Sequence, residues 1–517
     1  MREHRQRPRA QMSRRGLLGA TLLGTGLGAL TPSASWATAA PSPARSQEGP
    51  TGQRDAIEEF ADHILLTPYE AIPASALAMT RRQLEDTLAV ALAARNEPGA
   101  RDLLALAEEI GGRQEAAFWG SRLRGPAHEV ARASAVMAHA LEYDDTFEPG
   151  YLHPSAITFP AALAAAELAG GVSGREFVAA TTLAIDMACR LSIAGQPGVD
   201  GFTVGWHYTT LLGYVTSALA AARLLRLTPE QAVSAAGIAA HQAAGTAQSH
   251  IDAALSKRLG PGFACASGVF AARLAARGVT GPRRVLEGDR GFFRQYHAGR
   301  YSRELLLDGL GVRYPAEETS FKPWPSCRGS HTSVEAALRL VQEGRLRAHD
   351  IDRITIFNAP SEWPLLSQPL ETKRSPRSTV EAQFSIPWAV AAVLVDARLS
   401  LAHFTPEALQ RDDLLQMASR IDTQEDQSLA NPRGGPGFAR IEIVTRERGA
   451  LEMTAREAKG SPGSPMSAQD AQSKFDDCIA FAGLPRRFGE RLQRRIREVE
   501  ALDDVACLSA ALRAPSA

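Results

Sequence analysis

The sequence lacks the short motifs that commonly bind metals or nucleotides. Its five cysteines are scattered and form no CxxC pair, which argues against an iron–sulfur cluster or a structural zinc ion. It has no GxGxxG, P-loop or GxSxG, so nothing supports a nucleotide cofactor or a serine hydrolase. The 57 basic and 57 acidic residues cancel, and this balance gives no indication of nucleic acid or an anionic membrane as a partner.

The first forty residues have the pattern of an export signal. Residues Ser13 to Leu18 place paired arginines before a weakly apolar, glycine-rich run, and small residues surround Ala37 and Ala39. This pattern predicts a twin-arginine signal at 1–40, a linker at 41–55 and a periplasmic protein. An ordinary secretory signal or an uncleaved anchor is the alternative. No later run reaches the roughly 20 apolar residues that span a bilayer, so we expect no membrane contact in the mature form.

Hydrophobic spacing divides the remaining chain into three parts. Within 56–312, apolar residues recur every three or four positions in Ala- and Leu-rich sequence, which predicts a large all-helical domain. Within 313–458, three segments alternate apolar and polar residues between helical patterns, which predicts an α+β domain. These predicted strands are 351–358, 438–445 and 450–457, the last two joined by a turn at 446–449. A helical pattern returns in 459–517, so we expect a mainly α protein with an α+β second domain.

The densest set of acids and bases is the stretch HALEYDDTFEPGYLHPS at 139–155. The spacing of His139, Glu142 and Thr146 allows them to share one helical face. Such a set can bind, deprotonate or reprotonate a small polar substrate. A capping network at a helix end is the alternative, and a metal site built from the Asp and His side chains is a weaker one. The candidate catalytic residues here are Glu142, Asp144, Asp145, Thr146 and His153.

Three further groups place cations or histidines beside glycine or proline. They are His207 in TVGWHYTTLLG, Lys257 and Arg258 in SKRLGPGFA, and Lys322, Cys327, Arg328 and His331 in FKPWPSCRGSHTS. His207 is expected at a helix N-terminus, where the helix dipole disfavours imidazolium. Lys257 and Arg258 are expected just before the helix and can clamp a carboxylate. The last group lies at the predicted domain junction, a favoured place for a cleft. Capping or packing at the helix start is the alternative for His207, and a solvated surface pair is the alternative for Lys257 and Arg258.

These pieces, taken together and in this order, resemble the MmgE/PrpD family. That family includes 2-methylcitrate dehydratases, cis-aconitate decarboxylases and iminodisuccinate epimerases. The resemblance spans 56–482 and is carried by HALEYDDTF…HPS, GWHYT, SKRL.PGFA, GVTGPRRVLEGDRGFF, KPWPSC…H, EAQFSIPWAVA and KGSPGSPMSAQDAQSKF. It implies a large helical domain, a smaller α+β lid, and a C-terminal segment that returns to the helices. It also implies a homodimer without cofactor or metal, with the site between the domains.

The resemblance also assigns residues to the site. Positions that match functional residues of the family are Thr146, His153, His207, Lys257 and Lys322. Glu142 stands where the decarboxylase pattern has Asp, Cys327 stands where it has His, and Gly260 stands where His is common. The tyrosine expected near Trp363 is missing. These departures argue against a standard cis-aconitate decarboxylase.

The reactions of the family all need a carbanion beside a carboxylate, or the protonation of one. Lys257 and Lys322 would bind carboxylates and stabilise the enolate-like charge, and Arg258 and His331 are further candidates for substrate binding. His207 and His153 would move protons, oriented by Glu142 or by Asp144 and Asp145. Cys327 is either a proton donor or a wall of the pocket, and we favour the wall.

The sequence therefore predicts an exported lyase that acts on a small di- or tricarboxylic acid. The leading hypothesis is a hydro-lyase that dehydrates a 2-methylcitrate-like hydroxy acid. An epimerase or a decarboxylase acting on a related acid is the close alternative. A periplasmic carboxylate-binding protein without catalysis is the alternative from another class, since the departures at Glu142, Cys327 and Gly260 affect the site itself.

Overall fold

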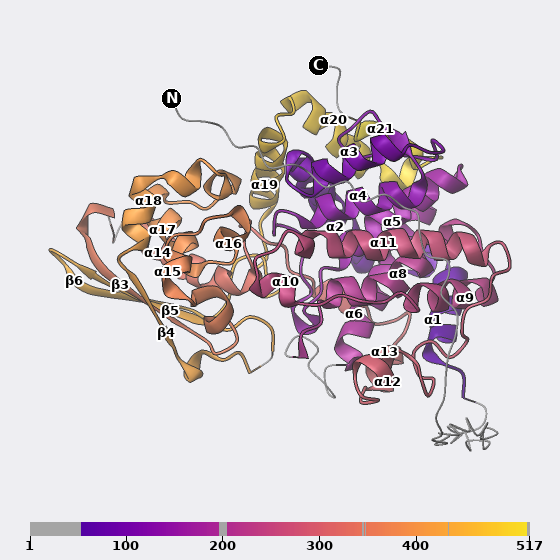
Figure 1. The fold of residues 1–517 in the computed structure, drawn as a ribbon, viewed down its shortest axis with the longest axis horizontal. Coiled ribbons are helices and arrows are strands. Elements are labelled where there is room, and N and C mark those ends of the chain that lie inside the picture. The colour runs from indigo at the N-terminus through magenta and orange to yellow at the C-terminus, as the bar shows by residue number, and fades with distance from the viewer. Residues whose placement is uncertain (1–52, 196–203, 344–345, 347, 433, 514–517) are drawn as a thin grey trace, which may run out of the picture. The chain divides into compact units, whose positions relative to one another are not determined.

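Alanine-rich helices form most of the chain's first half (Figure 1). The computed structural model describes residues 53–195, 204–343, 346, 348–432 and 434–513, so the predicted leader at 1–40 and almost all of the linker lie outside the described residues. The helices of this half include α1 (Ala56–Leu66), α2 (Ala74–Ala93), α3 (Ala100–Ile110), α4 (Ala127–His139), α5 (Pro154–Ala169), α6 (Gly174–Gly195), α8 (Tyr208–Leu224), α9 (Pro229–Ala240), α10 (Gln248–Ile251), α11 (Ser256–Ala275), α12 (Phe292–Tyr296) and α13 (Arg303–Leu307).

Small side chains allow the central helices to approach closely. Helix α11 packs against α4, α8 and α9, while α5 packs against α4 and α8. Gly213 of α8 is required by this packing, because a Cβ there would lie 2.8 Å from Ile157 Cγ2 and 2.9 Å from the Cβ of Ala264. The core of the predicted all-helical part therefore lies where Ala and Gly allow neighbouring helices to pack at short distances.

Helix α6 corrects the expectation that no later segment is long and apolar enough to span a membrane. By length and composition, Gly174–Gly195 passes that test. However, 94% of its most apolar window is buried inside the protein, where α6 packs against α5 and α8. Its apolar composition is that of a helix in a protein core, since both faces meet other helices.

A four-stranded sheet forms the centre of the α+β part (Figure 1). Its strands are β3 (Ile351–Asn358), β4 (Ile421–Glu425), β5 (Ala439–Thr445) and β6 (Gly449–Ala455), in the order β4-β3-β5-β6. β3 pairs in parallel with β4 and antiparallel with β5, and β5 and β6 form a hairpin. Helices α14 (His331–Gln342) and α17 (Ile386–Asp396) pack on the sheet, burying Ile354 and Ile356.

The structure confirms the predicted fold class and all three predicted strands. The sequence missed β4 and also the short antiparallel pair β1 (Ala116–Ala117) and β2 (Arg124–Gly125), which lies in the part predicted to be all-helical. Only Ile421 is buried in β4, and its IDTQE sequence lies at an edge of the sheet. An edge strand with one buried side chain has no alternating pattern to detect. The hairpin turn forms as predicted, with Gly449 at φ +71° opposite Thr445, a left-handed conformation that glycine adopts without strain.

The end of the chain packs against the first half. Helix α19 (Ala468–Phe481) contacts α2, and α20 (Arg486–Arg497) and α21 (Ala506–Ala511) follow. Lys474 of α19 forms a buried ion pair of 2.6 Å with Asp86 of α2, and Phe475 joins the core of the helical part. The predicted boundaries at 312/313 and 458/459 stay predictions.

Candidate active site

A cavity of about 390 Å³ is lined by side chains from both the helical part and the α+β part. It brings together seven residues predicted from the sequence, namely Glu142, Thr146, His153, His207, Lys257, Lys322 and Cys327. These residues come from positions up to 185 apart in the chain, so the fold brings four separate sequence motifs together in one concave site. A largely pre-formed cavity with convergent polar groups is the usual form of a small-molecule site.

The chain departs from a helix just where the site begins, which makes the predicted common helical face of His139, Glu142 and Thr146 wrong. Helix α4 ends at His139, and Glu142 has a left-handed backbone with φ +52°. The physical reason is that distant side chains satisfy three successive carbonyl groups. Gln383 donates to Leu141 O at 2.9 Å, Lys322 to Glu142 O at 3.0 Å, and Lys474 to Tyr143 O at 2.8 Å. These bonds replace those that further helical turns would supply.

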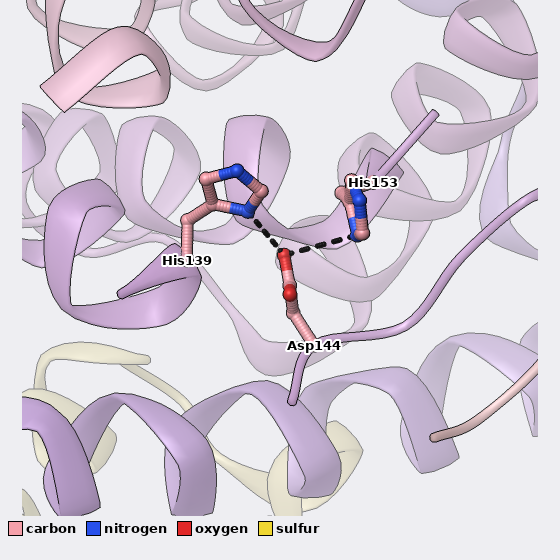
Figure 2. A group of neighbouring side chains, drawn as sticks. All are labelled: His139, Asp144 and His153. Carbon is pink, nitrogen blue, oxygen red and sulfur yellow. Dashed lines mark hydrogen bonds and ion pairs between the residues drawn. The ribbon is translucent and has the colours of Figure 1, made fainter. Parts of the chain in front are cut away.

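Asp144 joins two histidines (Figure 2), and of these three residues only His153 lines the cavity. Its Oδ2 lies 2.7 Å from Nδ1 of His139 and 3.3 Å from Nδ1 of His153. Burial raises the pKa of Asp144, but the electrostatic interactions and hydrogen bonds with His153 and His139 outweigh it and hold that pKa well below its usual range. Burial lowers the pKa of His139 well below its usual value, so His139 is neutral and donates its Nδ1 hydrogen to the carboxylate.

The acceptors around its Nδ1 fix the orientation of His153. Nδ1 lies 2.8 Å from Asp145 O and is also near Asp144. Because both neighbours accept hydrogen bonds, Nδ1 carries the hydrogen and the neutral ring has its basic lone pair on Nε2. His153 lies at the N-cap of α5, before Pro154, which is the turn position expected from the sequence. The side chain lines the cavity, as a general base must.

His207 lies at the N-cap of α8, which confirms the predicted helix start. Its Nδ1 is 2.7 Å from Thr210 Oγ1, and its ring stacks on His139 at 5.4 Å. Burial, together with the neighbouring His250 and His139 rings, lowers the pKa of His207 well below its usual value. A neutral imidazole at this position can accept or donate a proton, and the protein does not have to keep a charged ring buried beforehand.

Two buried ammonium groups meet at Glu142. Lys257 forms an ion pair with Glu142, and Lys322 Nζ lies 3.5 Å from Glu142 Oε2 and 3.9 Å from Asp144 Oδ1. Burial and the nearby Lys322 lower the pKa of Lys257 well below its usual value. Helix α11 already begins at Ser256, before the Gly260-Pro261-Gly262 run that was expected to precede it. Lys257 is therefore held rigidly in the first turn of a helix.

Two predicted substrate-binding residues do not line the cavity. Arg258 is 2% exposed and its guanidinium lies 3.3 Å from Gln383 Oε1 and 3.4 Å from Glu97 Oε2, so it is neither a surface cation nor a substrate clamp. It links the helical part to the α+β part. His331 is fully buried and lies 3.0 Å from Nη1 of Arg328. Its ring accepts that bond, because burial and Arg328 lower its pKa well below the usual value.

The cavity also has lining residues that were not chosen from the sequence. They are Glu148, His250, Glu362, Leu365, Leu366 and Phe384, among others, and Arg328 of the fourth sequence group lines the cavity as well. Arg328 and Glu148 form a 2.7 Å ion pair, and Glu148 belongs to a stretch already singled out for other residues. No sequence pattern marked His250 as a site residue, because its short helix α10 has no distinctive motif. Its ring centroid lies 4.9 Å from that of His207. Burial lowers the pKa of His250 to about 4.

Donor atoms of His139, Asp144 and His153 lie within 4.8 Å of one another, which is close enough to consider a metal ion. A metal would need lone pairs on the two Nδ1 atoms. Both Nδ1 atoms instead point at oxygen acceptors (Figure 2). The three residues therefore fit a hydrogen-bonded proton-transfer group better than a ligand set, and the absence of a metal or cofactor stays a prediction.

Asp145 lies beneath the cavity and gives a pH prediction. Its Oδ2 accepts from Ser155 Oγ at 2.6 Å and Gln83 Nε2 at 3.0 Å, yet burial raises its pKa to about 7. The unfolded chain loses this proton near pH 4, whereas the folded chain holds it until about pH 7. The contribution of this group to the free energy of unfolding is therefore fully present below pH 4 and is lost as the pH rises towards 7.

Asp145→Asn removes this titration. We expect the wild type to lose about 1 kcal/mol or more of unfolding free energy relative to the variant between pH 5 and pH 8. Urea unfolding at both pH values measures the difference, and the titrations shared by the two proteins cancel. A difference that is the same at pH 5 and pH 8 would contradict the assignment.

Cys327 lines the cavity, and its backbone N–H donates to Gln383 O at 2.9 Å. If the thiol is only part of the wall, Cys327→Ser keeps the backbone bond and changes the wall by one atom. We expect kcat and KM of this variant to stay within about twofold of the wild type, since a lost acid–base group would cost roughly 100-fold. Steady-state kinetics decides, and a loss of that larger size would make the thiol a proton donor.

Sequence comparisons agree with the predicted family. Family models described as the MmgE/PrpD N-terminal domain and the MmgE/PrpD C-terminal domain match residues 58–305 and 324–504. The chain therefore belongs to the MmgE/PrpD family, as its motifs predicted.

Similar proteins in this family are named as decarboxylases. The cis-aconitate decarboxylase-like protein oryM of Aspergillus oryzae is 25% identical over 456 residues, which is 85% of this chain and 93% of that protein. Cis-aconitate decarboxylases of Aspergillus terreus and Homo sapiens are each 25% identical and cover 77% of this chain, with 83% and 82% of their own lengths. Decarboxylases are lyases, so these relatives have the general reaction class predicted for this chain.

Proposed function

We propose that the protein is a lyase that acts on a small carboxylic acid through a carbanion stabilised by the adjacent carboxylate. The observation that carries the proposal is the pair of buried ammonium groups, Lys257 and Lys322, lining one cavity with two histidines. Buried cations beside a cavity bind an anion strongly, because little water competes with it. The names of the relatives point to the same substrate class.

The residues have separate tasks in this mechanism. Lys257 and Lys322 bind the carboxylate and stabilise the negative charge that spreads onto it when the neighbouring C–H bond breaks. His153 accepts that proton at Nε2, while Asp144 and the Asp145 carbonyl hold its Nδ1 hydrogen. The imidazolium that forms is stabilised by the Asp144 carboxylate. His207 is placed on another element and can transfer a second proton.

Within this class, we propose dehydration of a hydroxy acid as the reaction. Elimination of water needs one group to remove a proton and another to protonate the leaving hydroxyl. His153 and His207, which come from the starts of α5 and α8, supply two such groups. Decarboxylation needs only one protonation, and it is the second candidate because the relatives are named cis-aconitate decarboxylases. A 2-methylcitrate-like acid is the proposed type of substrate.

Proton NMR of the purified protein in heavy water tests this proposal. The panel comprises citrate, 2-methylcitrate, cis-aconitate and iminodisuccinate. Formation of an unsaturated acid identifies dehydration, loss of one carboxylate identifies decarboxylation, and deuterium exchange alone identifies epimerase-type chemistry. If no acid reacts while some raise the melting temperature, the protein is a carboxylate-binding protein and the lyase proposal is wrong.

We also propose that the protein is exported to the periplasm by the twin-arginine route. The support is the arrangement of Arg14 and Arg15 before a modest apolar run. Fractionation of a bacterial host that has this export system should find the full chain in the periplasm. Arg14→Lys combined with Arg15→Lys should leave it in the cytoplasm, and periplasmic recovery of that variant would exclude this route.

We further propose that the protein is a homodimer, as its family membership suggests. Size-exclusion chromatography with light scattering should give a mass of about twice 55.3 kDa, less the leader if it has been cleaved. A monomer across the micromolar range would contradict the proposal.

A further inference from the structure

We propose that the substrate carries an apolar substituent of several carbons and no more than two carboxylates. The carboxylate end binds at Lys257 and Lys322, and the substituent lies against Leu365, Leu366 and Phe384. This inference rests on the proposed function, because it specifies the 2-methylcitrate-like acid that the same site accepts. That acid has at least one carboxylate fewer than 2-methylcitrate and a longer alkyl group.

Size is the first reason. The cavity of about 390 Å³ falls within the range of pockets that enclose drug-sized ligands, roughly 300–1,000 Å³. A six-carbon acid would leave part of such a cavity filled with water. Water against an apolar wall makes few hydrogen bonds, so a larger ligand gains affinity by displacing it.

Charge is the second reason. Among the described residues, the cavity is lined by three cationic side chains, Lys257, Lys322 and Arg328, and by three carboxylates, Glu142, Glu148 and Glu362. Lys257 is paired with Glu142 and Arg328 with Glu148. Lys322 lies near both Glu142 and Asp144. Cations and carboxylates are equal in number in this lining, so every substrate carboxylate adds net negative charge to the cavity. A trianion adds the most, and a buried anion without a partner is costly.

Glu142 contributes to this charge balance through its contacts with both lysines. Its carboxylate contacts both lysines, so a substrate carboxylate bound there shares the two cations with it. It is one methylene longer than the Asp of the decarboxylase pattern, so it reaches further towards Lys257. A substrate with one carboxylate fewer complements a site that already contains one in contact with both lysines.

The remainder of the wall is the third reason. Apolar atoms make up the greater part of the cavity surface, and they include the side chains of Trp206, Pro360, Leu365, Leu366, Phe384 and Pro436. Leu366 and Phe384 are 1% and 5% exposed, so they are held in place by the core of the α+β part. An alkyl group placed here gains roughly fourfold in binding for each fully buried methylene.

The test compares 2-alkylmalates with chains from methyl to hexyl against citrate and cis-aconitate. Turnover is followed by proton NMR, and binding by isothermal titration calorimetry. We expect kcat/KM to rise at least about tenfold from methyl to pentyl, and both tricarboxylates to be poorer substrates than the pentyl acid. A rate that is flat or falls with chain length, or a preference for a tricarboxylate, overturns the inference while leaving the lyase proposal intact.

Binding measurements test this inference even if the lyase proposal fails. If no acid is turned over, the lyase proposal fails, and calorimetry decides the substrate class. Tighter binding of pentyl than of methyl acid then supports the inference, and equal or weaker binding overturns it.

A variant locates the substituent. Leu365→Trp narrows the apolar end and should lower the pentyl-to-methyl ratio of kcat/KM, or of binding constants, at least about fivefold. Leu106→Trp, which changes a 48% exposed leucine on α3, should leave that ratio unchanged. Equal ratios in both variants would show that the substituent does not bind at Leu365.

Discussion

Lys257→Met is expected to lower kcat/KM by at least about two orders of magnitude. The ammonium group is buried beside the cavity and shares Glu142 with Lys322. Without it, the carboxylate and the enolate-like charge lose one of two cations in a region where water cannot replace it. The loss should appear in kcat as well as in KM, because the charge on the carboxylate grows in the transition state.

A second variant guards against an indirect effect. Removing Lys257 leaves the Glu142 carboxylate with Lys322 as its remaining partner, and a poorly paired buried charge can itself distort a site. Lys257→Met with Glu142→Gln removes both charges. If this double variant is folded, as judged by its melting temperature, and stays equally impaired, the ammonium group is responsible. Recovery of the wild-type rate would mean that Lys257 only neutralises Glu142.

His207→Asn is expected to lower kcat by at least about 100-fold, the usual scale for losing a positioned acid–base group. Asn is a good N-cap residue, so α8 should keep its start. The variant should therefore retain the fold and lose proton transfer. Stopped-flow or steady-state kinetics on the best acid of the panel measures the effect.

His241 offers a matched control, since it is exposed and follows α9. His241→Asn should have the wild-type rate. If folded His207→Asn also keeps the full rate, then His207 has no role in proton transfer and the assignment of the site is wrong.

Local sequence patterns predicted the parts of the fold that depend on local chemistry. His207 begins a helix as expected, and the β5–β6 hairpin turns at Gly449. The prediction failed where residues that are distant in sequence determine the backbone conformation. The end of α4 depends on Gln383, Lys322 and Lys474 reaching its carbonyl groups, and no pattern near His139 reveals them.

The same distinction applies to the site. Lys257 and Arg258 are adjacent in sequence, yet only Lys257 lines the cavity, because successive residues on a helix point in different directions. His331 and Arg328 belong to one motif, but only Arg328 lines the cavity, and the His331 ring accepts a hydrogen bond from it. His250 contributes to the wall from a short helix with no recognisable signal. Residue type and motif indicated the chemistry, and tertiary packing decided which side chains reach it.

The central claim is that Lys257 and Lys322 hold a carboxylate while a proton is removed from the neighbouring carbon. Solvent deuterium incorporation at that carbon, followed by proton NMR on the best-bound acid of the panel, tests it most directly. The account predicts incorporation into the remaining acid by the wild type, and incorporation at least about 100-fold slower in Lys257→Met. Incorporation by folded Lys257→Met at the wild-type rate would contradict it.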